Sequence, residues 1–337
     1  MEQLTEPLKA TSTDEDSIVE LQELVWPSAE EATKEYFRWL TNVNPWGQAV
    51  TYVVKGNSGK VVSMHIVVPL PVLINGIKSL AGISVNIATH PDFRQQGLSA
   101  RLARAIYLEV QRLGIEFLIS VPNTMSHGLF QKNHFADLGK LSLLIHYTKV
   151  EKPIRVIKKL RSTLWTTKIG SVPHVYEISD FKELNLDGLI EPSIFCLAIN
   201  RDWLTWRYKD HPSRTYLCAI VGESDRPKVV VIYQILEVYQ RLLIVDFFVS
   251  PKAEFEEVKY LLDYVSQKGE LAACQFICFL GVPNSRKHHL LRKCGFWTYP
   301  FDSVWRPQIV AKSFGTIRPE FSVSTMDISY SILLNVD

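Results

Sequence analysis

A strand–loop–helix unit in residues 81–114 places the strongest constraint on the fold. Residues 81–90 (AGISVNIATH) are β-rich, and Pro91 ends them. A polar loop follows, and Gly97 opens a long helix that Gly114 is suited to stop. The helix carries one apolar stripe: Leu98, Leu102, Ile106 and Val110. A buried strand feeding an amphipathic helix predicts an α/β chain.

The corner of this unit suits an anionic ligand. A helix N-terminus presents unpaired N–H groups and the positive end of its dipole, which together favour a phosphate. Gly97 has no Cβ to keep a ligand away from the backbone, and Ser99 is small. An ordinary loop with a glycine at its corner explains the same spacing equally well, so the pattern alone leaves both readings open.

The surrounding pattern predicts a layered arrangement of strands and helices. Helices are expected over 14–25 and 29–41, and two strands are expected around the turn at 56–59. After the helix that ends near Gly114, we expect a strand over 116–121, a short helix over 123–132 and a closing strand over 137–148. Residues 200–294 repeat this order with helical stretches at 200–208, 253–268 and 284–294 and β-rich runs at 215–221, 228–237, 241–249 and 273–280. We interpret this as a distant internal duplication.

The duplication predicts a tandem organisation. We divide the chain into a first domain at 1–150, a basic connector at 151–175, a second domain at 176–310 and a C-terminal extension at 311–337. Each domain is expected to be a mixed, twisted sheet flanked by helices, in the α/β (α+β) class.

Composition excludes several functional classes. The 337 residues carry a formal net charge of +2, which gives no broad footprint for nucleic acid. Five cysteines in apolar surroundings indicate reduced thiols, and none has a partner pair at zinc-site spacing, so no metal is expected. The polar N-terminus is unlike a signal peptide, and no apolar run is long enough for a membrane span. We expect a soluble cytoplasmic protein without membrane contact and leave its oligomeric state open.

The unit at 81–114 resembles the acyl-CoA-binding motif of the GNAT superfamily of N-acyltransferases. That motif reads Arg/Gln-x-x-Gly-x-Gly/Ala after a strand, and here it is Arg94, Gln95, Gln96, Gly97, Leu98 and Ser99. Serine in place of the last small residue is a mild departure. A second landmark follows in the right order: a strand, Asn123, Phe130 where the family often has Tyr, and His134-Phe135 where Gly-Phe is usual. The resemblance covers residues 1–150.

The resemblance implies a CoA site between two strands that splay apart. The pantetheine arm would pair with backbone near Val85, Asn86, Ile87 and Ala88, and the pyrophosphate would lie on the amides between Arg94 and Ser99. In the family the position of Asn123 often contacts this arm, although we favour Asn123 as a cap of the following helix. The family reaction transfers an acyl group directly from a CoA thioester to an amine.

Catalytic groups are harder to place. Phe130 stands where many family members have a tyrosine acid, and phenylalanine cannot donate a proton. We name His127, His134 and His90 as candidate acid–base residues, each of which is alternatively a surface or core histidine. Either another group serves, the thiolate leaves without help, or the domain does not catalyse.

The second half resembles the superfamily more weakly. Glu254, Glu256 and Glu257 stand where phosphates would bind, so we expect no CoA there. Trp203, Arg207 and Tyr208 belong to a segment seen in tandem members and either contact an acceptor, such as an amino sugar, or fill the core.

These observations lead to two functional hypotheses. The favoured one is an acyl-CoA-dependent N-acyltransferase with acetyl-CoA as co-substrate and a small-molecule amine as acceptor. The alternative is a non-catalytic sensor or scaffold of GNAT fold that binds CoA or nothing. Aminoacyl-tRNA-dependent transfer is a weaker third reading, because the net charge of +2 offers no RNA footprint.

Overall fold

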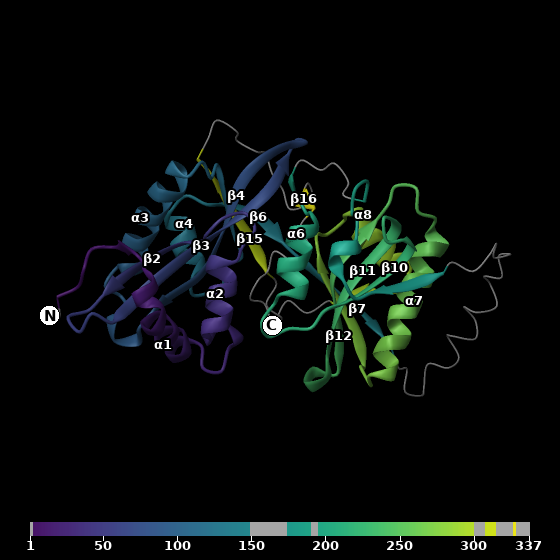
Figure 1. Cartoon of the computed structure of the whole chain (residues 1–337), viewed down its shortest axis with the longest axis horizontal. Helices are drawn as coiled ribbons and strands as arrows, with labels where there is room; N and C mark the ends of the chain where they lie inside the picture. Colours follow the sequence, from purple (N-terminus) through teal and green to yellow (C-terminus); the bar gives the residue numbers. More distant parts are fainter. Residues whose placement is uncertain (1–2, 149–173, 190–194, 300–306, 315–325, 328–337) are drawn as a thin grey trace.

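Two mixed sheets with helices on their faces make up the chain (Figure 1). The computed structural model describes residues 3–148, 174–189, 195–299, 307–314 and 326–327. The prediction of an α/β chain with two sheets flanked by helices is confirmed.

The first sheet has the strand order β1-β2-β3-β4-β5-β15-β6, with β9 paired to β3 and β16 to β9. Its strands are β1 (Leu8–Lys9), β2 (Val50–Lys55), β3 (Val61–Ile74), β4 (Ile77–Thr89), β5 (Phe117–Ser120), β6 (Ala136–Lys140), β9 (Phe195–Leu197), β15 (Gln308–Ser313) and β16 (Met326–Asp327). A two-residue turn, Asn75-Gly76, joins β3 to β4 with φ of 51° and 77°. Positive φ at both positions matches the twist of the hairpin, which therefore runs long.

Helices cover both faces of this sheet. On one face lie α3 (Leu98–Arg112) and α4 (His127–Lys132), packed on β2, β3 and β5 through one apolar cluster. On the other lie α1 (Glu15–Val25) and α2 (Lys34–Asn42), with the 3-10 turns η1 (Ser12–Asp14) and η2 (Glu30–Ala32). β4 and β5 are thus covered from both sides.

The helix α3 ends as the sequence predicts. The Gly114 N–H donates to the Gln111 carbonyl and the Ile115 N–H to the Val110 carbonyl, with φ of 77° at Gly114. This pair of bonds satisfies the last carbonyls of the helix and turns the chain sharply. Ile115 packs in the same apolar cluster as Val110, so β5 enters the sheet directly beneath α3.

The second sheet has the order β14-β7-β13-β12-β11-β10-β8. Its strands are β7 (Ser142–Tyr147), β8 (Val175–Ile178), β10 (Leu217–Glu223), β11 (Arg226–Leu236), β12 (Arg241–Val249), β13 (Phe276–Gly281) and β14 (Trp297–Thr298). The helical elements of this half are η4 (Phe181–Glu183), α6 (Arg201–Leu204), the π-helical turn η5 (Thr205–Lys209), η6 (Glu237–Tyr239), α7 (Phe255–Leu271) and α8 (Arg286–Lys293). α7 and α8 pack on one face through the second large apolar cluster.

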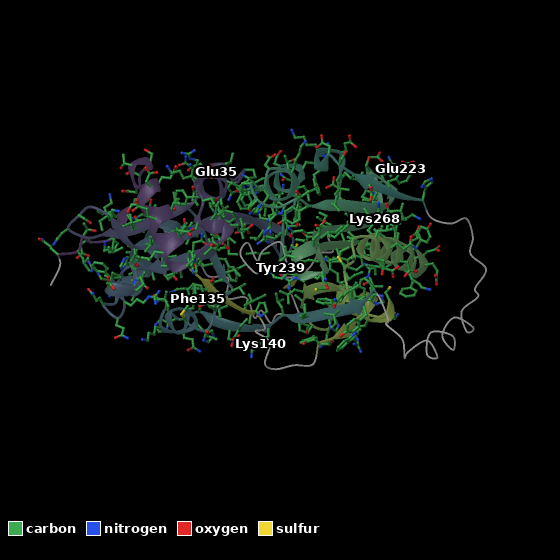
Figure 2. The ribbon with its side chains drawn as sticks, turned by 90° about the horizontal axis from the view of Figure 1, so that it is seen from below. Glu35, Phe135, Lys140, Glu223, Tyr239 and Lys268 are labelled. Carbon is green, nitrogen blue, oxygen red and sulfur yellow. The ribbon has the colours of Figure 1, made fainter. Side chains whose placement is uncertain are left out.

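The two sheets exchange strands across the boundaries expected from the sequence. β6 ends at Lys140, near the middle of the molecule in Figure 2, and after Leu141 the chain enters the second sheet as β7. In return β15, near the C-terminus, inserts between β5 and β6 of the first sheet. The expectation of one closing strand over 137–148 is therefore wrong: the segment forms two strands in different sheets. The apolar pattern of a strand does not reveal which neighbour it pairs with.

A shared core joins the halves. One apolar cluster includes Ile83 and Ile119 of the first sheet as well as Ile232 and Leu243 of the second. At its edge the Trp39 Nε1 donates to the Trp206 carbonyl at 2.9 Å, and the Trp206 Nε1 donates to the Trp39 carbonyl at 3.1 Å. Their rings stack with centroids 4.7 Å apart. Apolar burial and reciprocal hydrogen bonds fix the two halves together.

Candidate functional site

The start of α3 leaves a row of backbone N–H groups free. Gly97 is the N-cap residue with φ of 73°, and no side chain caps the helix. The N–H groups of Ala100 and Arg101 donate to the Gly97 carbonyl at 3.1 Å. Across the described chain, none of the N–H groups of residues 95–99 donates to a protein acceptor. Consecutive free amides at the positive end of a helix dipole can bind a phosphate.

The space in front of these amides is open. A Cβ built on Gly97 would meet no atom within 4 Å, and residues 91–97 are largely exposed. A φ of 73° also restricts this position to glycine, since other side chains are strained there. The loop therefore has both the room and the donors that a pyrophosphate needs.

Side chains of the loop hold this arrangement. His90 Nδ1 accepts a backbone N–H within the 3-10 turn η3 (Pro91–Phe93) at 3.2 Å. Arg94 Nε donates to the Thr89 carbonyl at 3.3 Å while the guanidinium remains exposed beside the free amides. The Ser99 hydroxyl lies 3.3 Å from the Thr89 hydroxyl, so serine is accommodated at this small-residue position. The structure brings the predicted residues 94–99 together around one corner.

Next to this corner β4 and β5 diverge. Their parallel pairing joins 81–83 to 117–119. Within the described residues no pairing continues from there to the carboxyl ends of the two strands. The Ser120 hydroxyl donates to the Ser84 carbonyl at 2.9 Å and so closes the apex of the gap. We call this divergence the fork; residues 85–88 of β4 form one of its edges.

A β-bulge accentuates the fork. The register of β3 and β4 shifts between Met64 and Ile66, so that Asn86 and Ile87 both lie opposite His65. Asn86 has φ of 48°, an uncommon value for a residue other than glycine. A bulge bends its strand and re-aims its backbone groups. The residues expected to hold the pantetheine arm lie at and beside this bulge.

The α4 region fits its expected landmarks only in part. The Asn123 side chain accepts the N–H groups of Met125 and Ser126 at 3.1 and 2.9 Å, so it caps the turn before α4. Phe130 is 1 % exposed and packs edge-on against Phe135 with ring centroids 4.9 Å apart. The α4 position that carries tyrosine in many family members is thus purely apolar.

The three candidate histidines lie at separate places. His90 shapes the loop before α3, His127 begins α4, and His134 follows its end. His134 is exposed and has φ of 60°, and its N–H donates to the Gln131 carbonyl, which is the C-terminal role usually given to glycine. Within the described residues no hydrogen bond, ion pair or ring contact joins any two of the three. Their assignment as acid–base residues stays a prediction.

A buried histidine beside the fork was not identified from the sequence. His65 Nε2 lies 2.6 Å from the Ser84 hydroxyl, and the His65 ring meets the Tyr107 ring edge-on with centroids 5.8 Å apart. Burial lowers the pKa of His65 to about 3 and raises the pKa of Tyr107, so both stay neutral at physiological pH. The signal was present as a histidine within the apolar run VVSMHIVV of β3.

Trp203, Arg207 and Tyr208 lie in the core between the halves, each at most 2 % exposed. Arg207 Nη1 donates to the Tyr216 hydroxyl at 3.0 Å, and the Tyr208 hydroxyl donates to Asp246. This placement agrees with the second reading of these residues, that they fill the core.

Metal and membrane features were also sought. The described residues contain no group of three or more His, Cys, Asp or Glu side chains placed to hold a metal ion. None of the helices in the described ranges has the length and apolarity needed to cross a bilayer.

Comparison with known proteins bears on this site. A family model described as "Acetyltransferase (GNAT) domain" matches residues 6–131. A search of curated proteins found no match to the chain.

Solved structures resemble the whole chain. An Enterococcus faecalis protein of unknown function, described as a probable N-acyltransferase, is 14 % identical with a TM-score of 0.68, covering 93 % of this chain and 73 % of its own. A GCN5-related N-acetyltransferase from Anabaena variabilis is 12 % identical with a TM-score of 0.66, covering 92 % and 73 %. Saccharomyces cerevisiae N-myristoyltransferase with bound myristoyl-CoA is 11 % identical with a TM-score of 0.57, covering 93 % and 80 %. At these identities the likeness shows the fold.

Proposed function

We propose that the protein transfers a short acyl group from acyl-CoA to a primary amine, from the premise that residues 6–131 match a GNAT acetyltransferase domain model and that the chain has the fold of GCN5-related N-acetyltransferases. The open N-terminus of α3 beside the fork is the observation that carries the proposal. A fold supports many functions, so the argument depends on this site rather than on the fold.

Each part of the site has a role in the proposal. The amides of residues 95–99 bind the pyrophosphate, and Arg94 adds a charged contact. The edge of β4 at 85–88, which faces the fork beyond the last β4–β5 pair, pairs with the amide groups of the pantetheine arm, which takes the place of a neighbouring strand. The bulge at Asn86 turns backbone groups towards the thioester. The acceptor amine then attacks the thioester directly in a ternary complex.

The closed apex of the fork favours a small acyl group. On the side of Ser84 and Ser120 away from the fork, β4 and β5 pair with each other at 81–83 and 117–119. An acyl chain lying between the strands therefore cannot extend past these two serines. Behind this point a Cβ on Gly82 would come within 2.6 Å of Val67 and 2.8 Å of Leu118, which shows how tightly that face is packed. We therefore propose acetyl-CoA as the donor.

The acceptor is proposed no more narrowly than a primary amine. An amino-sugar acceptor was suggested by aromatic side chains that the structure buries in the core. A cytoplasmic location is part of the proposal, because acyl-CoA is an intracellular co-substrate and all five cysteines are free thiols.

The phenylalanine at position 130 is also compatible with a second function, a non-catalytic CoA sensor. Because this side chain cannot protonate the leaving thiolate, a GNAT-fold sensor that binds CoA without turnover accounts for the same open helix N-terminus. The two functions differ in whether CoA appears when amines are added.

Calorimetric titration with acetyl-CoA tests the proposal. We expect micromolar, one-to-one binding to the wild type, and a loss of roughly a hundredfold or more in Gly97→Glu, because the carboxylate fills the phosphate position with like charge. Gly114→Glu is the matched control. Gly114 lies at the other end of α3 with φ of 77° and nothing within 4 Å of a Cβ, so it meets the same strain and gains the same charge.

Two results would overturn the proposal. Absence of binding to folded wild type removes the acyl-CoA function altogether. Equal loss in both glycine variants shows that the effect comes from helix strain rather than from the phosphate position.

A further inference from the structure

The fork lacks a proton donor at its expected place. When an amine attacks a thioester, the electron pair of the broken C–S bond moves to sulfur, and a nearby donor stabilises the developing thiolate. Phe130 fills the α4 position with an apolar ring that is 1 % exposed. If the protein turns over acyl-CoA, another group must serve or sulfur must leave unaided.

Tyr107 of α3 lies over the fork on the same face as α4. Its ring contacts His65 of β3 on one side and Lys312 of β15 on the other, with the His65 centroid 5.8 Å away and the Lys312 Nζ 5.6 Å away. β4 and β5 are the strands between β3 and β15, so a ring that reaches both flanks must lie above them. The Tyr107 ring also packs against Phe135, labelled in Figure 2, which itself packs on Phe130.

The Tyr107 hydroxyl is buried and has no hydrogen-bond partner within the described part of the chain. The residue is 4 % exposed, so water does not reach the group freely. A buried hydroxyl without a partner costs free energy and is therefore uncommon. Such a group beside a candidate binding site is available to a ligand atom.

The two serine hydroxyls near the apex are already engaged. The Ser120 hydroxyl donates to the Ser84 carbonyl, and the Ser84 hydroxyl lies against His65 Nε2. His65 cannot act as an imidazolium donor, since burial lowers its pKa to about 3. Burial raises the pKa of Tyr107, so its hydroxyl keeps its proton and is a hydrogen-bond donor.

We infer that the Tyr107 hydroxyl donates to the CoA sulfur and supplies from α3 the contact that Phe130 cannot make from α4. The inference rests on the proposed function. As the C–N bond forms and the C–S bond breaks, the electron pair moves to sulfur, and the hydrogen bond from the Tyr107 hydroxyl stabilises the thiolate that forms. The attacking nitrogen loses a proton to solvent, and solvent protonates the thiolate when CoA leaves.

A neighbouring lysine helps to hold the Tyr107 ring in place. Lys312 Nζ donates to the Asn133 carbonyl at 2.7 Å and lies 5.6 to 6.0 Å from the ring centroids of Tyr107, Phe314 and Phe135. Burial lowers the pKa of Lys312, and its side chain packs over the face of the Tyr107 ring. β15 supplies this lysine, so the strand exchange brings a residue from near the C-terminus to the fork of the first half.

A thermodynamic cycle tests the contact without requiring the acceptor. We would titrate CoA and desulfo-CoA into the wild type and Tyr107→Phe. The wild type should bind CoA roughly three- to tenfold more tightly than desulfo-CoA, the range expected for one hydrogen bond, and Tyr107→Phe should lose this preference. Desulfo-CoA affinity should be unchanged by the substitution.

The second half offers a matched control. Tyr233 also has a buried hydroxyl without a partner among the described residues, and burial likewise raises its pKa. Tyr233→Phe should keep the wild-type preference for CoA. Adding Phe130→Tyr to Tyr107→Phe should restore part of it, which a purely structural role of Tyr107 would not allow.

The outcomes separate the inference from the proposed function. An unchanged preference in Tyr107→Phe, or equal wild-type affinity for CoA and desulfo-CoA, overturns the inference while CoA binding itself stands. Failure of the folded wild type to bind either ligand overturns the proposed function.

Discussion

The two helices that follow the diverging strands start in opposite ways. α3 follows β4 and begins at Gly97 with no side-chain cap, so its first amides remain free. α7 follows β12 and begins at Glu254 with a complete capping box: the Glu254 side chain accepts the N–H of Glu257, and the Glu257 side chain accepts that of Glu254 at 2.9 Å. One helix leaves its donors for a ligand, and the other satisfies them within the chain.

The strands before these helices differ in the same sense. β12 and β13 pair in parallel up to Ile244 and Phe279, much as β4 and β5 pair up to Ile83 and Ile119. At the end of β12, however, the Arg286 guanidinium donates to the carbonyls of Val249 and Ser250 at 3.1 and 3.0 Å. The second half keeps the fold of the first but fills the same region with its own side chains. The free donors, rather than the fold, distinguish the half that we expect to bind CoA.

The sharpest way to break this comparison is to transplant the α7 cap into α3. Ala100 occupies the helix position of Glu257, so Ala100→Glu would place a carboxylate on the Gly97 N–H. We expect acetyl-CoA affinity to fall roughly a hundredfold and the free energy of unfolding to rise by about 0.5–1 kcal/mol. Calorimetry and urea denaturation measure the two effects.

Leu108→Glu adds the same charge on an exposed face two turns further along α3 and should leave affinity close to wild type. Loss of both affinity and stability in Ala100→Glu would mean that the carboxylate disrupts the helix rather than capping it.

The pH dependence of the unfolding free energy should also differ between the two halves. In the first half His65 lies beside the bulge, and its folded pKa of about 3 is below the unfolded value of about 6.5. The unfolded state therefore binds the proton first, and stability is full above pH 6.5 and declines as pH falls towards 3. Beside the β12 bulge stands Tyr233, which remains neutral throughout.

His65→Gln should remove about 1.4 kcal/mol per pH unit from the slope of unfolding free energy between pH 6 and 4. His211, whose pKa burial lowers to about 2, keeps its own contribution in the variant. An unchanged slope in His65→Gln contradicts a neutral buried histidine at the fork.

The cap of α7 gives a smaller effect. Glu257→Ala removes the carboxylate that accepts the Glu254 N–H and pairs with Lys228 at 2.6 Å, and it should lower unfolding free energy by about 1 kcal/mol. Glu256→Ala removes a neighbouring exposed carboxylate and should change stability by less than about 0.5 kcal/mol. If the two variants have equal unfolding free energies in urea, the capping box does not stabilise the N-terminus of α7. Acetyl-CoA affinity should be unaffected in both.

The smallest expected effect is at Arg94. Its exposed guanidinium contributes a screened charge contact, so Arg94→Ala should weaken acetyl-CoA binding about threefold at low salt and less at high salt. Arg104→Ala removes an exposed charge further along the same helix and serves as the control. A loss of acetyl-CoA affinity above tenfold would show that the Arg94 side chain, rather than the backbone amides, makes the main contact to the phosphates.

Local signals in the sequence predicted the local structure of the site. Pro91, Gly97 and Gly114 fix backbone geometry through their own chemistry, and α3 and its loop form where they are expected. Asn75-Gly76 carries an equally clear hairpin signal, and the turn between β3 and β4 forms there.

Features set by distant partners were not predictable in this way. β7 and β15 join sheets on the far side of their domain boundaries, and the edge at which a strand pairs is decided by long-range packing. The surroundings of Tyr107 are hidden for the same reason: in the sequence it looks like a core aromatic. Only the tertiary structure shows its ring against His65 and its buried hydroxyl without a partner in the described chain. Trp203 could be read as either ligand contact or core until its burial was known.

Hydrogen–deuterium exchange with and without acetyl-CoA tests the comparison most directly. In the free protein the amides of residues 95–99 have no acceptor in the described chain, and residues 95–97 are exposed, so these amides should exchange fast. Acetyl-CoA should slow exchange there and along residues 85–88, and leave residues 254–258 at the start of α7 unchanged. Protection at 254–258, or bound acetyl-CoA without protection at 95–99, would contradict the assignment of the cofactor site to the first half.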